Sequence, residues 1–339
     1  MMANYNDKVR EFDMILRNNE CVKELRGTTI LISGVTGTIG SYLFEFLEYY
    51  HSKFSADIKI VCPIRDISKI SNEWRSLNNV TWCNYYELKL SCDNIDYVVH
   101  CASPTRSKEF IEHPVETIDG VLDGTKRMLE LFRNCSGKGF LYISSIEVYG
   151  ENFTRDSISE TNSGNVDSLK IRNCYPIAKR LAENLCMAYS AEYKLPIKIA
   201  RLSQIIGTHP SDDRLMAYIC RSAVDKTQIV LHSNGASTKS YCYIMDCISA
   251  MIYILVIGNS TAYNVSNPLA VASVYELAKL VSEKYIGLPV IVENKTLDMY
   301  PSSGCLILNS EQLQKLGWVP EVGIEDAFDR LINQIKEQQ

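Results

Sequence analysis

The feature that most constrains this chain is a short apolar run, residues 28–33, that leads directly into three regularly spaced glycines. The run has the length of a buried strand, and residues 38–50 have the spacing of a helix. The first glycine permits a tight turn, the second lets the backbone approach a pyrophosphate, and the third permits close helix–strand packing. This unit predicts a dinucleotide site at the amino end of the helix. Its candidate cofactor-binding residues are Gly34, Thr36, Gly37, Thr38, Ile39 and Gly40.

Strand-like and helix-like stretches alternate through the first two hundred residues. We expect further strands at residues 57–62, 80–84, 95–101, 139–144 and 197–202, and helices at residues 115–134 and 174–193. Strands that alternate with helices imply right-handed crossovers and a parallel sheet covered on both faces. The predicted fold class is therefore α/β, a doubly wound Rossmann sheet.

Three segments follow from this reading. Residues 1–26 form an N-terminal helical extension, residues 27–202 the dinucleotide-binding domain, and residues 203–339 a smaller substrate-binding lobe interleaved with it. In the lobe, two short strands flank residues 233–235. Helices are expected near residues 246–257, 274–284 and 324–336.

Composition narrows the class of protein. With 35 basic and 40 acidic residues the net charge of the 339-residue chain is −5, and no basic run offsets it, which argues against nucleic-acid or anionic-membrane partners. The longest apolar stretch, residues 248–257, is too short to span a bilayer, and the first 26 residues lack the apolar core of a signal peptide. The 12 cysteines form no C-x-x-C pair and the five histidines are scattered, so we expect a reduced, cytoplasmic protein without a metal site.

The choice of dinucleotide depends on the end of the second strand, where an acidic residue would accept the ribose 2′-hydroxyl of NAD. Residues 61–65 contain no carboxylate, and Arg65 could instead form a bidentate pair with the 2′-phosphate of NADP. The competing interpretation is that Arg65 pairs with Asp66 or lies in solvent. We favour NADP(H), with NAD(H) as the alternative.

Tyr175 and Lys179 stand four residues apart, on one face of the expected helix. An ammonium beside a phenol lowers its pKa and makes it a usable acid or base. The spacing alone is common in this chain. It gains meaning because Ser144 and Ser145 end a predicted strand at the sheet edge where open α/β sheets bind ligands. A serine hydroxyl there could polarise the oxygen that Tyr175 protonates.

The motifs GVTGTIG, SSIEVYG and YPIAK, in this order, resemble the extended short-chain dehydrogenase/reductases, the NAD-dependent epimerase/dehydratase family. Within it the chain is similar to UDP-glucuronate decarboxylases and to reductases that form CDP-polyols. The resemblance implies a homodimer formed through residues 115–134 and 174–193. It also implies a catalytic Ser145 with Tyr175 and Lys179, a Glu147 beside the sugar, and a cofactor lined by Ala102, Ser103 and Lys179.

The chain departs from the family pattern at four places. The acidic residue after the second strand is absent, and Val121 replaces a usual asparagine. The segment that would touch the nucleotide diphosphate reads Gln204 to Thr208 without the usual motif. Lys239 stands where decarboxylases carry an arginine, and lysine cannot grip a carboxylate bidentately.

These departures favour an NADPH-dependent reductase that converts a CDP-linked ketose to a nucleotide-polyol for surface polysaccharides. Tyr175 would donate the proton, while Lys239 and Gln204 would contact the diphosphate. The alternative is an epimerase, 4,6-dehydratase or decarboxylase with tightly bound NAD, in which Glu147 is an added base. A third reading, a silent dinucleotide-binding sensor, is disfavoured because such a protein needs only the glycine loop.

Overall fold

Seven parallel strands form the central sheet of the computed structural model, which describes residues 2–87, 94–152, 156–207, 214–293 and 304–338. The strand order is β10-β6-β5-β4-β1-β2-β3. The strands are β1 Thr29–Ser33, β2 Lys59–Ile64, β3 Val80–Asn84, β4 Tyr97–His100, β5 Gly139–Ser145, β6 Ile197–Leu202 and β10 Ala262–Val265. The chain order reverses between β1 and β4, which is where open α/β sheets place their ligands.

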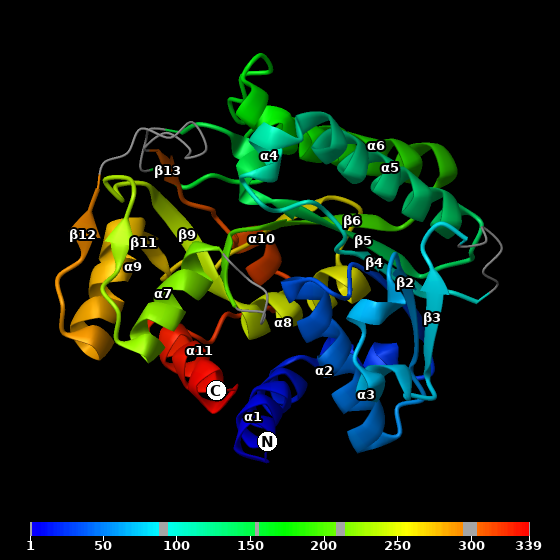
Figure 1. The fold of residues 1–339 in the computed structure, drawn as a ribbon. Coiled ribbons are helices and arrows are strands. Elements are labelled where there is room, and N and C mark those ends of the chain that lie inside the picture. The colour runs from blue at the N-terminus through cyan, green and yellow to red at the C-terminus, as the bar shows by residue number, and fades with distance from the viewer. Residues whose placement is uncertain (1, 88–93, 153–155, 208–213, 294–303, 339) are drawn as a thin grey trace.

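Helices cover both faces of this sheet (Figure 1). The main ones are α2 Thr38–Phe54 and α8 Ile244–Ile257 on one face, and α5 Pro114–Arg133 and α6 Cys174–Tyr193 on the other. Each pair of helices buries its own apolar core against the strands. The core under α2 and α8 includes Phe44, Phe46, Ile248 and Met251. The core under α5 and α6 includes Met128, Phe132, Ala182 and Cys186. The predicted doubly wound fold is confirmed.

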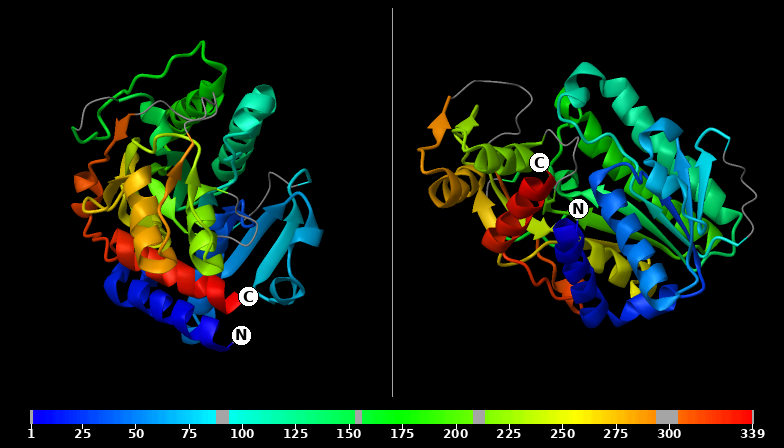
Figure 2. Two further views of the ribbon diagram at one scale, coloured as in Figure 1. Left: turned by 60° about the vertical axis from the view of Figure 1, so that its left-hand side comes forward. Right: turned by 60° about the horizontal axis from the view of Figure 1, so that its bottom comes forward.

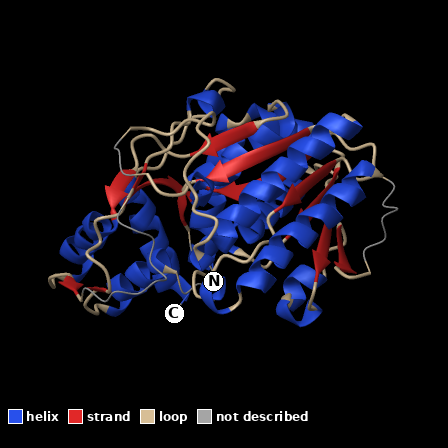
Figure 3. Cartoon of the chain, turned by 90° about the horizontal axis from the view of Figure 1, so that it is seen from above, coloured by secondary structure: helices blue, strands red, loops and turns tan. Residues whose placement is uncertain are grey.

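A smaller lobe stands beside one end of the sheet (Figures 1 and 3). Its sheet has the order β11-β9-β13, and β7 also pairs with β9; β12 pairs with β8 separately. The strands are β7 Gln204–Ile206, β8 Val230–Leu231, β9 Thr238–Tyr243, β11 Val271–Ser273, β12 Ile291–Val292 and β13 Cys305–Leu306. The helices are α7 Leu215–Asp225, α9 Val274–Val281 and α11 Ile324–Gln338. Short helices elsewhere are α3 Asn72–Arg75, α4 Glu109–Glu112 and α10 Glu311–Gln314.

The N-terminal segment forms α1 Met2–Asn18 and a 3-10 helix, Glu20–Leu25. Helix α1 lies beside α11, and the two chain ends are close together (Figure 2). Its buried Glu11 accepts hydrogen bonds from Tyr243 (2.6 Å), Arg330 (3.3 Å) and Gln334 (3.4 Å). Burial nevertheless raises the pKa of the Glu11 carboxyl. Helix α1 also packs on α2 and α8, so it touches both the Rossmann layer and the lobe.

Candidate active site

The glycine loop joins β1 to α2 in a conformation that requires glycine. Gly34 has φ +77°, and a Cβ there would lie 2.6 Å from the backbone nitrogen of Ala102. A Cβ on Gly40 would overlap the carbonyl oxygen of Gly34. Gly37 is the N-cap of α2 and brings no side chain to its amino end, so the first turn can receive a phosphate. The loop therefore lies against Ala102, which follows β4 and, with Ser103, is a further candidate cofactor residue.

Arg65 follows β2 at the same edge of the sheet and is exposed. The neighbouring Asp66 carboxylate accepts hydrogen bonds from the Ser68 backbone and hydroxyl through its Oδ1, at 2.9 and 2.7 Å. The charge of Arg65 acts on Tyr85, where it opposes the rise in phenol pKa that burial causes. The guanidinium is thus available to a ribose phosphate.

The predicted catalytic residues meet at the carboxyl edge of β5. Ser145 ends β5 and caps the 3-10 helix Ile146–Tyr149, its Oγ accepting from the Glu147 backbone nitrogen at 3.2 Å. Tyr175 lies in the first turn of α6, and the hydroxyls of Ser145 and Ser103 act on its phenol, opposing the rise in its pKa. The Tyr175 ring stacks on Phe110, with centroids 4.4 Å apart and planes inclined by 6°.

Lys179 lies one turn further along α6, where its Nζ donates to the Ile143 carbonyl at 2.7 Å. Burial lowers the pKa of Lys179 to about 8, and the charge of Glu183 opposes this shift. The pKa of Tyr175 is raised, first by burial and then by the charge of Glu147, while its hydrogen bonds and Arg172 oppose the rise. The net shift is opposite to the lowering expected from an adjacent ammonium, because desolvation of the phenolate outweighs the nearby positive charge.

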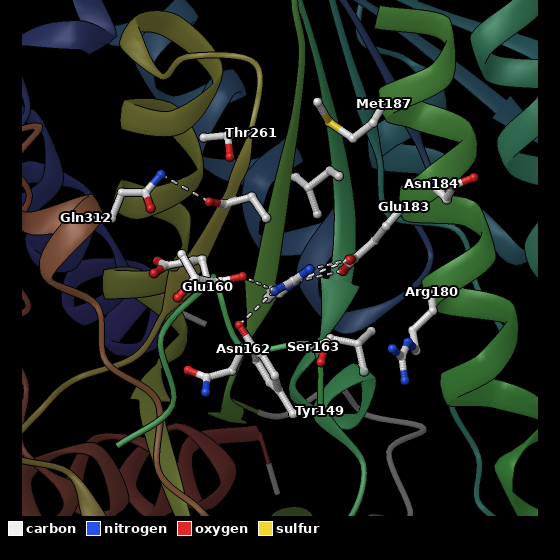
Figure 4. A pocket seen from close by; sticks show the side chains of 15 residues that line it. Tyr149, Glu160, Asn162, Ser163, Arg180, Glu183, Asn184, Met187, Thr261 and Gln312 are labelled. Carbon is white, nitrogen blue, oxygen red and sulfur yellow. Dashed lines mark hydrogen bonds and ion pairs between the residues drawn. The ribbon is translucent and has the colours of Figure 1, made fainter. Parts of the chain in front are cut away.

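The two serines of the predicted pair have separate roles. Ser144 Oγ donates to Glu183 at 2.5 Å, and Glu183 also accepts from Arg201 Nε and Nη2, at 3.0 and 2.7 Å. Glu183 and Arg201 form a wall of a pocket of about 390 Å³ between α6 and the sheet edge (Figure 4). Ser144 is thereby committed to a buried network, and Ser145 is the hydroxyl that faces Tyr175.

Glu147 is held by a residue that the sequence analysis missed. Arg172, in the 3-10 helix Ile171–Asn173, donates Nη1 and Nη2 to the two carboxylate oxygens of Glu147, at 3.1 and 3.4 Å. The charges of both residues act on Lys239, whose pKa is lowered by burial and by Arg172 while Glu147 opposes the shift. Arg172 precedes Tyr175 by three residues, and its charge was the only available signal.

The two predicted substrate residues, Gln204 and Lys239, line one pocket of about 90 Å³. Arg214, also missed, lines the same pocket and donates to Thr38 Oγ1 of the glycine loop at 3.0 Å. The pocket therefore adjoins the candidate cofactor site. Thr208, the end of the Gln204 segment, lies outside the described residues, and Val121 is buried in the core of α5.

Two absences among the described residues bear on other classes of site. Within those residues no three histidine, cysteine, aspartate or glutamate side chains gather as a metal would require. No helix in the described ranges has the length and apolar character needed to cross a bilayer.

A model of the NAD dependent epimerase/dehydratase family matches residues 30–266. UDP-glucuronic acid decarboxylase 1 of Xenopus tropicalis is 25% identical over 313 residues, 91% of this chain and 72% of the relative. dTDP-D-glucose 4,6-dehydratase of Dictyostelium discoideum is 28% identical over 269 residues, 75% of this chain and 61% of the relative.

Solved structures share the fold. The UDP-glucose 4-epimerase of Thermotoga maritima, solved with UDP-glucose, has a TM-score of 0.76 and 20% identity, covering 92% of this chain and 99% of its own. The UDP-glucuronic acid 4-epimerase of Bacillus cereus, solved with UDP-glucuronic acid and NAD, has the same score and identity, with 92% and 100% covered. With the glycine loop, the Ser145–Tyr175–Lys179 grouping and a family match over most of its length, the chain belongs to the NAD-dependent epimerase/dehydratase family.

Proposed function

We propose that this protein acts on a nucleotide sugar through a closed redox cycle with bound NAD, and that the cycle includes dehydration or decarboxylation. The observation that carries the proposal is the Glu147 carboxylate, whose charge acts on the Tyr175 phenol. Reduction of a ketone needs one proton donor, whereas elimination needs a second group to move a proton. The relatives named above, a decarboxylase and a dehydratase, support this reading over the reductase favoured by the sequence departures.

The dinucleotide, when bound, supplies a hydride acceptor that later returns the hydride. Tyr175 would take the proton of the sugar hydroxyl at the carbon that is oxidised, and Ser145 would donate a hydrogen bond to the resulting carbonyl oxygen. Because burial raises the pKa of Tyr175, the phenolate that takes this proton is the minor form before substrate binds. The carbonyl then activates the neighbouring position. In dehydration Glu147 would take the C–H proton there and deliver it to the leaving hydroxyl, which departs as water; of the two alkene carbons left behind, the one that lost the hydroxyl would accept the returned hydride and the other the proton held by Tyr175. In decarboxylation the C–C bond to the carboxylate would break with release of CO₂, the enolate would accept a proton from water, and the returned hydride and the Tyr175 proton would restore the alcohol. Lys179 would hold the nicotinamide ribose.

The diphosphate of the substrate fits the pocket lined by Gln204, Lys239 and Arg214. Two cations there match the charge of a diphosphate, and neither needs the bidentate geometry of a carboxylate site. The structural relatives named above were solved with UDP-sugars, which supports this class of substrate.

A second candidate function rests on Arg65. Its exposed guanidinium at the end of β2 suits the 2′-phosphate of NADP, which would accompany net reduction of a nucleotide-linked ketose, such as a CDP-ketose for surface polysaccharides. A cofactor of that kind enters reduced and leaves oxidised, whereas a closed cycle retains it.

The deciding experiment is to heat-denature the purified protein and identify the nucleotide released. Stoichiometric NAD supports the closed cycle. A protein that purifies empty, prefers NADPH over NADH, and loses that preference in Arg65→Ala supports the reductase and contradicts our proposal.

Turnover is then tested with UDP-glucuronic acid and dTDP-glucose, and products are identified by NMR. Tyr175→Phe should abolish turnover. Tyr275→Phe is a matched control, because Tyr275 and Lys279 have the same spacing on α9 and Tyr275 is exposed. Glu147→Gln should lower the rate of elimination about 100- to 10,000-fold and leave a residual rate that can be measured. If it leaves turnover intact, Glu147 has no proton-transfer role.

We also propose a homodimer through α5 and α6. Val115 and Leu181 on these helices are 64% and 52% exposed, which a helix-to-helix contact would cover. Leu181→Asp should shift the sedimenting species from dimer to monomer. A monomeric unsubstituted chain would contradict the proposal.

A further inference from the structure

The carboxylate of Glu147 is held by two hydrogen bonds at once. Arg172 meets both of its oxygens, and the two side chains are only 14% and 26% exposed. A planar guanidinium that grips a planar carboxylate in this way fixes its orientation as well as its charge. The direction in which Glu147 points is therefore set by Arg172.

Arg172 is itself fixed by an aromatic stack. Its guanidinium lies 5.0 Å from the centroid of Phe110, and Phe110 stacks on the ring of Tyr175. Arg172 and Tyr175 thus both lie against the ring of Phe110. Because Arg172 also holds Glu147, the carboxylate and the phenol are placed relative to each other by the same support.

Lys239 is the competing partner for Glu147. The charge of Glu147 acts on Lys239, and Lys239 lines the pocket assigned above to the diphosphate. Without Arg172, Coulomb attraction would draw the carboxylate toward that ammonium. Arg172 therefore keeps Glu147 beside Tyr175 and leaves Lys239 available to substrate.

We propose that Arg172 is a positioning residue that aims the Glu147 carboxylate at the reacting sugar and keeps it apart from Lys239. This inference rests on the proposed function of Glu147. Arg172 acts through Glu147, so removing it should impair turnover and leave substrate binding nearly unchanged.

The first test compares steady-state kinetics of Arg172→Met, Arg172→Lys and a control. Misplacing a proton-transfer group by about 1 Å costs on the order of 100-fold, so Arg172→Met should lower kcat about 100-fold and change KM less than about threefold. Arg172→Lys restores the charge without the two-point grip and should recover part of kcat. The control is Lys170→Met, which breaks an exposed ion pair with Glu151, also 3.1 Å long, and should change neither constant.

The second test is a double-mutant cycle. Arg172→Met should cost less than about twofold in kcat when Glu147→Gln is already present, because Arg172 then has no carboxylate to aim. A full effect in that background overturns the inference, as does a rise in KM that matches the fall in kcat.

A cycle on unfolding keeps the inference separate from the proposed function. Urea unfolding of the same four proteins should show that the two substitutions are coupled. Absence of coupling overturns the inference whatever the turnover results. If the unsubstituted protein turns over no nucleotide sugar, the proposed function fails and the unfolding cycle alone decides whether Arg172 holds Glu147.

Discussion

Replacing Glu183 by glutamine tests whether the buried pair behind Ser144 supports the fold. Glu183 is 6% exposed and accepts hydrogen bonds from Ser144 and from two nitrogens of Arg201. Glutamine preserves the shape and can still accept from Ser144, so the main loss is the negative charge. The Arg201 side chain is 15% exposed and would remain largely out of water without a counter-charge.

Removing one partner of a buried ion pair costs about 3–5 kcal/mol. Arg201 would keep two other acceptors, the Tyr149 hydroxyl at 2.9 Å and the Glu160 carbonyl at 3.1 Å, so we expect the lower end. Glu183→Gln should therefore lower the free energy of unfolding by about 3 kcal/mol, measured by equilibrium unfolding in urea.

The matched control is Glu130→Gln on α5. Glu130 pairs with Arg133 at 2.9 Å, but these side chains are 26% and 37% exposed, so the loss should be at most about 1 kcal/mol. Adding Arg201→Met to Glu183→Gln removes the stranded charge and should restore part of the stability. Equal losses in Glu183→Gln and Glu130→Gln would refute the reasoning.

Three further outcomes are expected. Gly40→Ala places a Cβ on the backbone of Gly34 and should weaken NAD binding at least about tenfold in a fluorescence titration, whereas Gly323→Ala, with open space around it, should not. Lys179 has a folded pKa of about 8 and an unfolded pKa near about 10.4. At pH values between these two pKa values the unfolded chain binds one more proton at this residue than the folded chain does. Lys179 therefore makes the free energy of unfolding rise with pH by up to about 3 kcal/mol, and urea unfolding of Lys179→Met should show a correspondingly shallower rise. Phe12 is 4% exposed and packs edge-on against Phe46, so Phe12→Ala leaves a cavity and should lower the free energy of unfolding by about 3 kcal/mol. The control Phe54→Ala changes an exposed ring and should lower it by less than about 1 kcal/mol. Equal losses in the two variants would show that α1 is not packed as described.

The sequence predicts α6 and β6 with their observed bounds, 174–193 and 197–202, because residues that end a helix and precede a strand lie between them. Lys194 ends the helix in the left-handed conformation, and Pro196 precedes the strand. Strand β2 begins and ends two residues later than predicted and so includes Pro63. Pro63 is tolerated because pairing with β1 extends only to Val61, so no ladder bond needs its missing N–H.

The residues of the candidate site also differ in whether the sequence could predict them. Ser145, Tyr175 and Lys179 could be predicted because each lies in a strongly patterned strand or helix. Arg172 and Arg214 could not, since Arg172 lies in a short 3-10 helix and Arg214 caps a helix start, and the path of both segments depends on tertiary packing. Strand β10 was missed for a related reason. Its four residues show no alternation of apolar and polar side chains, and they form the edge strand of the sheet because they pair with β6.

The position of α1 has a consequence for how the molecule assembles during synthesis. Helix α1 is among the earliest parts of this sequence to be translated, yet the hydrogen-bond partners of its buried Glu11 are Tyr243, Arg330 and Gln334. Two of these belong to α11, 319 and 323 residues further along the chain. A ribosome-bound chain would therefore leave the Glu11 carboxylate without Arg330 and Gln334 until α11 has been made, although the Phe46 partner of Phe12 is made early. Full docking of α1 follows synthesis of α11, and a nascent chain stalled before residue 330 should expose this helix to proteases more readily than the 339-residue chain.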